Sequence, residues 1–223
     1  MSFKGEFIEF LFKSNVLIFG DFVAKSGRET PYMINTGNFR TAKQLAILGE
    51  YYADCIETKM DKSVNVLFGP AYKGIPLAVA ASTALYHKYS RDISVTFNRK
   101  EKKDHGEGGQ IIGYIPQSND RIAIIEDVIT AGTAVRESLE LLGRIAEIRI
   151  TNLIVSVDRL ERGQKNKTTI EELNDDFGIQ TSAIVTIEDI LNFLHNREID
   201  GKIAIDNAMK NKIEDYLNLY GVS

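Results

Sequence analysis

Two adjacent carboxylates, Glu126 and Asp127, are the residues of this sequence best suited to chemistry. They follow an apolar run, 122–125, that predicts a buried strand, and they precede a loop of small and hydroxyl-bearing residues, 130–133. A helical pattern starts at 133. In an open α/β sheet, ligands bind beyond the carboxyl ends of the strands. A small-residue turn that opens a helix offers backbone N–H groups to a phosphate.

The combination of carboxylates and a phosphate-binding turn narrows the class of ligand. Two carboxylates would repel a lone anion, but they suit a ligand that carries hydroxyls or a metal as well as a phosphate. This points to a sugar phosphate. The run 122–134 resembles the signature of the type I phosphoribosyltransferases, which bind 5-phosphoribosyl 1-diphosphate (PRPP), at every position.

A second strand-to-helix turn spans residues 68–76. Gly69, Ala71 and Gly74 let the backbone approach a ligand closely, and Lys73 is a point charge suited to a diphosphate. Alone, this segment is better interpreted as a tight turn with a solvent-facing lysine. Because a loop of the same architecture stands at 126–134, we favour a ligand-binding turn.

A third segment, 98–110, is polar, charged and glycine-rich. It carries Arg99, Lys100, Lys102, Lys103 and His105 within seven residues of a chain whose net charge is −4. Such a run is most often a solvated surface. The local excess of cations and the glycines at 106, 108 and 109 favour instead a mobile loop that closes over a diphosphate.

Several segments, in the same order as in the family, are similar to the orotate branch of the phosphoribosyltransferases. They are 25–32, 72–76, 99–109 and 158–163, the last reading Asp-Arg-Leu-Glu-Arg-Gly. The resemblance implies transfer of the phosphoribosyl group from PRPP to orotate, which gives orotidine 5′-monophosphate and diphosphate in pyrimidine (UMP) biosynthesis. The alternatives are transfer to another base, or a regulator that binds PRPP without catalysis.

The resemblance also implies roles for individual residues. The catalytic set is Lys100, Lys103, His105, Glu126 and Asp127. The PRPP-binding set adds Tyr72, Lys73, Arg99, Val128, Ile129, Thr130, Ala131, Gly132, Thr133 and Ala134. The orotate-binding set is Lys25, Met33, Ile34, Thr130 and Arg159. It further implies Mg²⁺ bound mainly through PRPP, and a homodimer in which the loop at 98–109 serves the neighbouring subunit.

Three positions leave alternatives open. Arg159 can grip a carboxylate with two parallel hydrogen bonds, but an internal salt bridge with Asp158 or Glu161 is an equally good interpretation from the residues alone. Met33 and Ile34 stand where the family usually has an aromatic pair, so apolar contact replaces stacking if those side chains meet the base. Glu126 replaces a more frequent aspartate and keeps its charge.

Composition fits a cytoplasmic α/β protein. The chain has 223 residues and 43% hydrophobic residues, enough for a full core, and the negative net charge does not favour nucleic acid. The single cysteine, Cys55, predicts a buried thiol in a reducing compartment. We see no signal peptide, no apolar run long enough to span a membrane and no histidine or cysteine cluster at metal-binding spacing.

Periodicity predicts a mainly parallel sheet with helices on both faces, in a single domain over 1–223 in which 1–40 form a small cap and 41–223 the core and C-terminal helices. The expected helices are 3–19 (ended by Gly20), 41–60 (capped by Thr41), 75–89, 133–145, 168–177 (ended by Gly178), 187–196 and 205–219. The expected strands are 22–25, 32–35, 64–68, 93–97, 122–125, 148–157 and 181–185.

Overall fold

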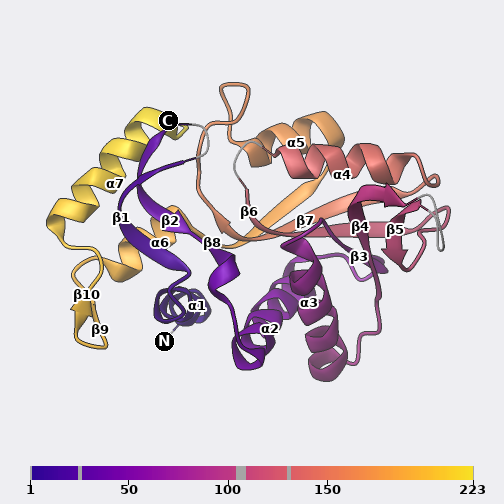
Figure 1. The fold of residues 1–223 in the computed structure, drawn as a ribbon, viewed down its shortest axis with the longest axis horizontal. Coiled ribbons are helices and arrows are strands. Elements are labelled where there is room, and N and C mark those ends of the chain that lie inside the picture. Colours follow the sequence, from indigo (N-terminus) through magenta and orange to yellow (C-terminus); the bar gives the residue numbers. More distant parts are fainter. Residues whose placement is uncertain (1, 25–26, 104–108, 130–131, 223) are drawn as a thin grey trace.

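A computed structural model describes residues 2–24, 27–103, 109–129 and 132–222, except the side chains of Lys102 and Lys103. Within these residues the main sheet has six strands in the order β5-β4-β3-β6-β7-β8 (Figure 1). The strands are β3 (Val66–Gly69), β4 (Ser94–Lys103), β5 (Gly109–Gly113), β6 (Arg121–Ile129), β7 (Arg149–Asp158) and β8 (Gln180–Thr186). All neighbouring pairs are parallel except β4 with β5, so the predicted fold class is confirmed.

Alternate residues of the central strand β6 face two separate cores. Ile122 and Ile124 pack in one core with residues of α4 (Thr133–Gly143) and α5 (Thr169–Phe177). Ala123 and Ile125 pack in the other with residues of α2 (Ala42–Lys59) and α3 (Gly74–Tyr89). The helices therefore cover both faces of the sheet, α4 and α5 above it and α2 and α3 below it in Figure 1. The strict alternation fixes the register, because a one-residue slip would exchange the two cores.

The predicted helix boundaries are largely confirmed, because the side chains that set them are visible in the sequence. Thr41 caps α2 in a reciprocal capping box with Gln44. Thr168 caps α5 in the same way, and Gly178 ends that helix in the left-handed conformation.

Residues before position 41 and at the far end of the chain build a hood beside the sheet. It contains α1 (Phe3–Lys13), the antiparallel pair β1 (Leu17–Val23) and β2 (Glu29–Ile34), α6 (Ile187–Leu194), α7 (Asn207–Tyr220) and a small pair, β9 (Glu198–Ile199) with β10 (Lys202–Ile203). Helix α7 packs against β2. The predicted helix over 3–19 is wrong beyond Lys13, since Asn15 adopts a positive φ of 53° and Leu17 starts a strand.

The prediction of a loop over 98–110 is also wrong in part. Strand β4 continues through Lys103, and β5 pairs with it in antiparallel register, Asn98 opposite Ile111 and Lys103 opposite Gly109. Charged residues are poor indicators of strands, yet they are tolerated at the rim of a sheet, where they discourage pairing with other chains. Residues 104–108 lie outside the described part of the chain.

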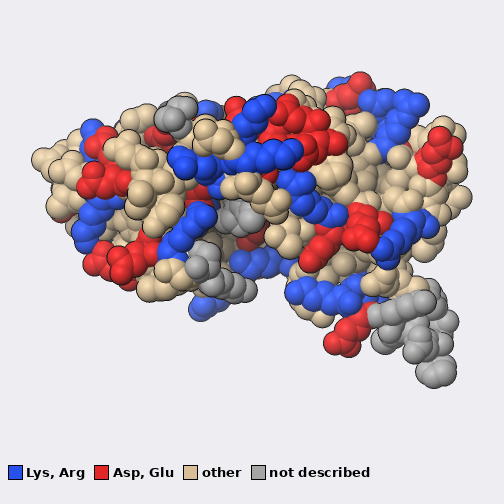
Figure 2. Space-filling model, turned by 90° about the horizontal axis from the view of Figure 1, so that it is seen from above, with Lys and Arg blue, Asp and Glu red and all other residues tan. Residues whose placement is uncertain are grey.

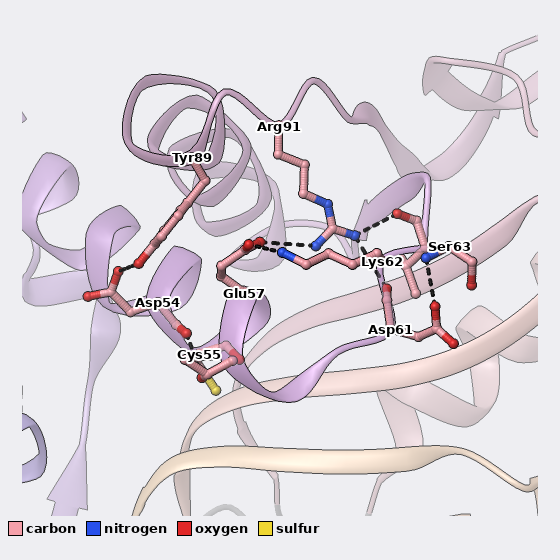
Figure 3. Close-up of polar contacts among 10 residues, drawn as sticks. Asp54, Cys55, Glu57, Asp61, Lys62, Ser63, Tyr89 and Arg91 are labelled. Atoms are coloured by element: carbon pink, nitrogen blue, oxygen red, sulfur yellow. Dashed lines mark hydrogen bonds and ion pairs between the residues drawn. The ribbon is translucent and has the colours of Figure 1, made fainter.

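A polar cluster ties the ends of α2 and α3 to the start of β3 (Figure 3). The Arg91 guanidinium donates to the Val64 carbonyl at 2.8 Å and to Glu57 at 3.5 Å. Nearby, the Tyr89 hydroxyl donates to Asp54. The cluster lies at the start of β3, and the turn at 70–74 follows the other end of that strand.

Candidate active site

The two carboxylates lie in the last part of β6, which is longer than predicted. The strand runs to Ile129, and Glu126 pairs with Val155 of β7. Asp127 is 9% exposed and accepts hydrogen bonds from the Thr36 hydroxyl at 2.7 Å and from the Val128 N–H at 2.8 Å. The Lys73 ammonium lies 3.1 Å from the same oxygen, Oδ2, that binds Thr36. Asp127 is thus held in one orientation from three directions.

Glu126 lies in the same buried region, but fewer hydrogen bonds and cations offset the cost of burying its charge. Burial, followed by the charge of neighbouring Asp127, raises the pKa of Glu126 to about 7. The Asp127 N–H donates to Glu126 Oε1 at 3.2 Å, which partly offsets this effect. A carboxyl group that titrates near neutrality gains its charge readily when a cation or a developing positive charge comes near.

A pocket of about 280 Å³ lies beside the carboxylates. Its lining residues are Glu126, Asp127, Val128, Ile129, Gly132, Thr133, Ala134 and Val135. Gly132 precedes α4 with a positive φ of 71°, and a Cβ there would lie 2.8 Å from the Thr169 methyl group. Glycine therefore lets the first turn of α4 open toward the pocket, and the free N–H groups of that turn suit a phosphate.

The turn after β3 lies next to these groups. Gly74 begins α3, and a Cβ there would lie 2.9 Å from the Ile125 carbonyl, so the turn packs directly against β6. The Ala71 N–H donates to the Asn98 side chain of β4 at 2.8 Å. The Lys100 ammonium lies 5.2 Å above the ring of Tyr72. The ends of β3, β4 and β6 thereby bring Lys73 to Asp127 and Lys100 to the neighbouring turn.

Arg159 follows the last residue of β7, at the same edge of the sheet as the end of β6, since Ile129 lies opposite Asp158. Its Nε and Nη2 both lie 2.6 Å from Glu161 Oε1. Of the two interpretations that the sequence left open, the internal salt bridge is present, with Glu161 as the partner. Arg159 also lies over the ring of Tyr32 at 4.7 Å.

The structure brings together most, but not all, of the sequence-predicted residues. Those near the pocket and the neighbouring turn are Tyr72, Lys73, Lys100, Glu126, Asp127, Val128, Ile129, Gly132, Thr133 and Ala134. Arg99 precedes Lys100 in β4, and Met33 and Ile34 end β2 in the hood. Lys25, the side chain of Lys103, His105, Thr130 and Ala131 lie outside the described part of the structure.

Sequence reasoning missed several residues that hold the site. Besides Thr36 and Asn98, these are Tyr52, whose hydroxyl donates to the Glu126 carbonyl at 2.7 Å, and Ser156, whose hydroxyl donates to the Asp127 carbonyl. Thr36 stands in an Asn-Thr-Gly turn just after β2, the only signal that marked it. Tyr52 and Ser156 sit inside regular elements, and their contacts depend on the tertiary fold.

Acidic and basic side chains lie interspersed over the face seen in Figure 2, which does not favour a nucleic-acid surface there. Among the described residues, no group of three metal-ligating side chains could by itself hold an ion. No helix within those residues is long and apolar enough to cross a membrane.

Comparison with known proteins identifies the class. The model of the phosphoribosyl transferase domain matches residues 39–189. An orotate phosphoribosyltransferase of Clostridium acetobutylicum is 47% identical over 220 residues, 99% of this chain and 98% of that protein. One from Cronobacter sakazakii is 41% identical over 223 residues, 99% of each chain. The crystal structure of orotate phosphoribosyltransferase from Francisella tularensis superposes with a TM-score of 0.81 at 39% identity, over 97% of this chain and 99% of that one.

The fold is thus that of a phosphoribosyltransferase. Within that class, the chain belongs to the orotate phosphoribosyltransferase family.

Proposed function

We propose that the protein transfers the 5-phosphoribosyl group from PRPP to orotate, with Glu126 and Asp127 at the ribose. The observation that carries this assignment is that the two carboxylates line a pocket at the start of α4 while Lys73 contacts Asp127 from the next turn. Lys100 lies over Tyr72 of the same turn. In this arrangement the pocket binds the 5-phosphate, and Glu126 and Asp127 accept hydrogen bonds from the ribose hydroxyls. Lys73 and Lys100 bind the diphosphate.

The chemistry follows from this arrangement. A ring nitrogen of orotate forms a bond to the anomeric carbon while the carbon–oxygen bond to diphosphate breaks, and the diphosphate leaves with the bonding electrons. The ribose ring acquires positive charge in the transition state, next to Asp127. Lys73 and Lys100 stabilise the negative charge on the departing diphosphate. From the family resemblance, Arg99, Lys103 and His105 act on the same leaving group.

The residues present fit Mg²⁺ bound together with PRPP. Glu126 and Asp127 offer carboxylate oxygens, which Mg²⁺ prefers, but two side chains leave most of its coordination sphere to substrate oxygens and water. When bound, the ion neutralises diphosphate charge and orients the substrate.

The base lies toward the hood. We assign orotate contacts to Arg159, Lys25, Thr130 and the 33–34 segment, supported for Arg159 by its place at the sheet edge beside the end of β6. Arg159 would bind the carboxylate that distinguishes orotate from uracil. Met33 is 36% exposed and offers an apolar contact in place of an aromatic ring, whereas Ile34, on the opposite face of β2, packs against the core.

The domain organisation, assembly and location of the protein are also inferred. We take residues 1–223 as one functional domain and a two-fold homodimer as the working unit, with the segment at 98–109 serving the partner's site. The cytoplasm is the proposed location, supported by the buried free thiol of Cys55.

One assay tests the function directly. Purified protein supplied with PRPP and Mg²⁺ should consume orotate, followed as loss of orotate absorbance, and release diphosphate. Uracil, adenine and hypoxanthine should be poor substitutes. Use of uracil as efficiently as orotate would contradict the assignment of a carboxylate-binding residue.

A further inference from the structure

Arg159 is the centre of a buried polar cluster that joins the sheet edge to the hood. Its guanidinium contacts Glu161 at 2.6 Å, the Tyr216 hydroxyl at 3.3 Å and the Thr30 hydroxyl at 3.5 Å. The Tyr216 hydroxyl also donates to Glu161 Oε1 at 2.7 Å. Thr30 comes from β2 and Tyr216 from α7, so segments far apart in the chain meet at one side chain.

These contacts involve only two of the three guanidinium nitrogens of Arg159, Nε and Nη2. Glu161 Oε1 occupies the edge formed by Nε and Nη2, and the ring of Tyr32 lies below the plane at 4.7 Å. Among the contacts of the described residues, Nη1 takes part in none. An arginine has two edges that can meet a carboxylate. Protein occupies the Nε–Nη2 edge, and on the Nη1–Nη2 edge Nη2 contacts the Tyr216 and Thr30 hydroxyls while Nη1 remains for a ligand.

The charges in the cluster favour an incoming anion. Arg28 lies 3.7 Å from the second oxygen of Glu161. The three charged groups in contact are thus Arg28, Arg159 and Glu161, whose formal charges of +1, +1 and −1 leave +1. Glu161 and Tyr216 are 9% and 6% exposed, so their contacts with Arg159 are poorly screened by water.

We propose that Glu161 and Tyr216 are positioning residues that hold Arg159 for the orotate carboxylate, which makes α7 part of the base-recognition machinery. The inference rests on the proposed contact between Arg159 and orotate. An unrestrained arginine must lose side-chain freedom when it binds, whereas a fastened one has already lost it. Glu161 holds the guanidinium, and the Tyr216 hydroxyl, which donates to Glu161, fixes the carboxylate in turn.

A different reading of the same contacts makes the opposite prediction. If Glu161 merely competed with orotate for Arg159, then removal of its charge would strengthen orotate binding. The Glu161→Gln variant separates the two, since it keeps the size of the side chain and a carbonyl acceptor but weakens the grip on the guanidinium.

The test compares Tyr216→Phe and Glu161→Gln with Tyr220→Phe as a matched control. Tyr220 lies in the same helix, with its ring 5.0 Å from that of Tyr216, and the change deletes only a hydroxyl. Steady-state KM for orotate and for PRPP, kcat and the melting temperature are measured for each protein, with Arg159→Ala alongside. Tyr216→Phe removes the hydrogen bond donated to Glu161 and the one accepted from Arg159, which should raise the orotate KM roughly three- to tenfold.

Glu161→Gln should raise the orotate KM at least as much, while the PRPP KM of both variants and all constants of Tyr220→Phe stay near wild type. A general loss of structure would instead raise both KM values together. An unchanged orotate KM in Tyr216→Phe, or a lowered one in Glu161→Gln, would overturn the positioning role while Arg159→Ala still impaired orotate use. If Arg159→Ala itself left the orotate KM unchanged, the proposed orotate contact would fail instead. If Glu161→Gln does not fold, the comparison of Tyr216→Phe with Tyr220→Phe still tests the positioning role.

Discussion

The Lys73 ammonium lies 3.1 Å from Asp127 Oδ2 and joins the turn after β3 to the end of β6. This contact places a cation proposed for the diphosphate on a carboxylate proposed for the ribose. Binding of PRPP therefore has to rearrange or share it. The two partners differ in exposure, because the Lys73 side chain is 53% exposed and that of Asp127 is 12% exposed.

The exposure of Lys73 predicts that its role is in binding and not in stability. Lys73→Gln should change the free energy of unfolding by less than about 1 kcal/mol, as is typical of exposed ion pairs. The PRPP KM should rise at least about tenfold, because a charged contact to the diphosphate is lost. Urea denaturation and steady-state kinetics measure the two effects, and a destabilised variant with normal PRPP use would assign Lys73 a structural role.

Asp127→Asn tests the charge next to the ribose. The amide keeps the size of the side chain and can still accept one of the hydrogen bonds from Thr36 and Val128, but it cannot stabilise positive charge. We expect kcat to fall by roughly 10²- to 10³-fold, as for other electrostatic contacts to a transition state. The melting temperature should change little. Full activity per folded molecule, together with a lower melting temperature, would show that the carboxylate acts only in the fold.

Glu126 predicts a specific dependence of stability on pH. Its pKa is raised from 4.5 to about 7 in the folded protein, so between these values the folded state binds more protons than the unfolded state. Its contribution to the free energy of unfolding is therefore fully present below pH 4.5 and falls as pH rises through about 7. Urea titrations from pH 5 to 8 should show wild type losing stability relative to Glu126→Gln, and a constant difference would contradict the raised pKa.

Base selection should depend on Arg159. Arg159→Ala should weaken orotate use by roughly 2–5 kcal/mol if a buried carboxylate loses its partner. Its contact with Glu161 adds a second effect, because Glu161 is left buried with fewer partners, so a lower melting temperature is expected as well. Kinetics must be recorded where circular dichroism shows the variant folded. An orotate KM that rises no more than the PRPP KM would argue against a contact with the base.

The proposed homodimer can be tested by complementation. Lys103→Ala and Asp127→Asn are each first shown to be inactive and are then co-expressed. If each site takes its cationic segment from the other chain, a mixed dimer contains one intact site and one doubly damaged site. Random mixing makes half of the dimers mixed, so activity should recover to roughly a quarter of wild type for a two-fold symmetric dimer. No recovery in verified mixed dimers would remove the shared site and leave the transferase assignment in place.

The sequence predicted the scaffold well because its signals are local. The apolar run before Glu126, the cap at Thr41 and the stop at Gly178 each act within a few residues, and the structure confirms them. The helix predicted through residue 19 failed because Asn15 leaves the helical conformation, and apolar residues at 16–19 fit a strand as well as a helix.

Long-range contacts of the site were beyond sequence reasoning. The Thr36 hydroxyl meets Asp127 across 91 positions of the chain, and no local pattern links them. The sequence was compatible with a salt bridge from Arg159 to either Asp158 or Glu161. The path of the chain after β7 places Glu161, and not Asp158, against the guanidinium. The composition of the charge run in β4 predicts a loop, whereas its pairing with β5 makes it a strand.

The contacts that join β2, Arg159 and α7 have a consequence for the order of folding. Its contacts span 129 positions between Thr30 and Arg159 and 57 between Arg159 and Tyr216. Contacts between such distant segments carry a high loop-closure entropy, so they tend to form after local helices and adjacent strand pairs. The pocket beside the carboxylates is lined by one stretch of the chain, 126–135, and the contact from Thr36 to Asp127 spans 91 positions, fewer than the 129 between Thr30 and Arg159. A refolding chain is therefore expected to regain the place for the sugar phosphate before it can tell one base from another.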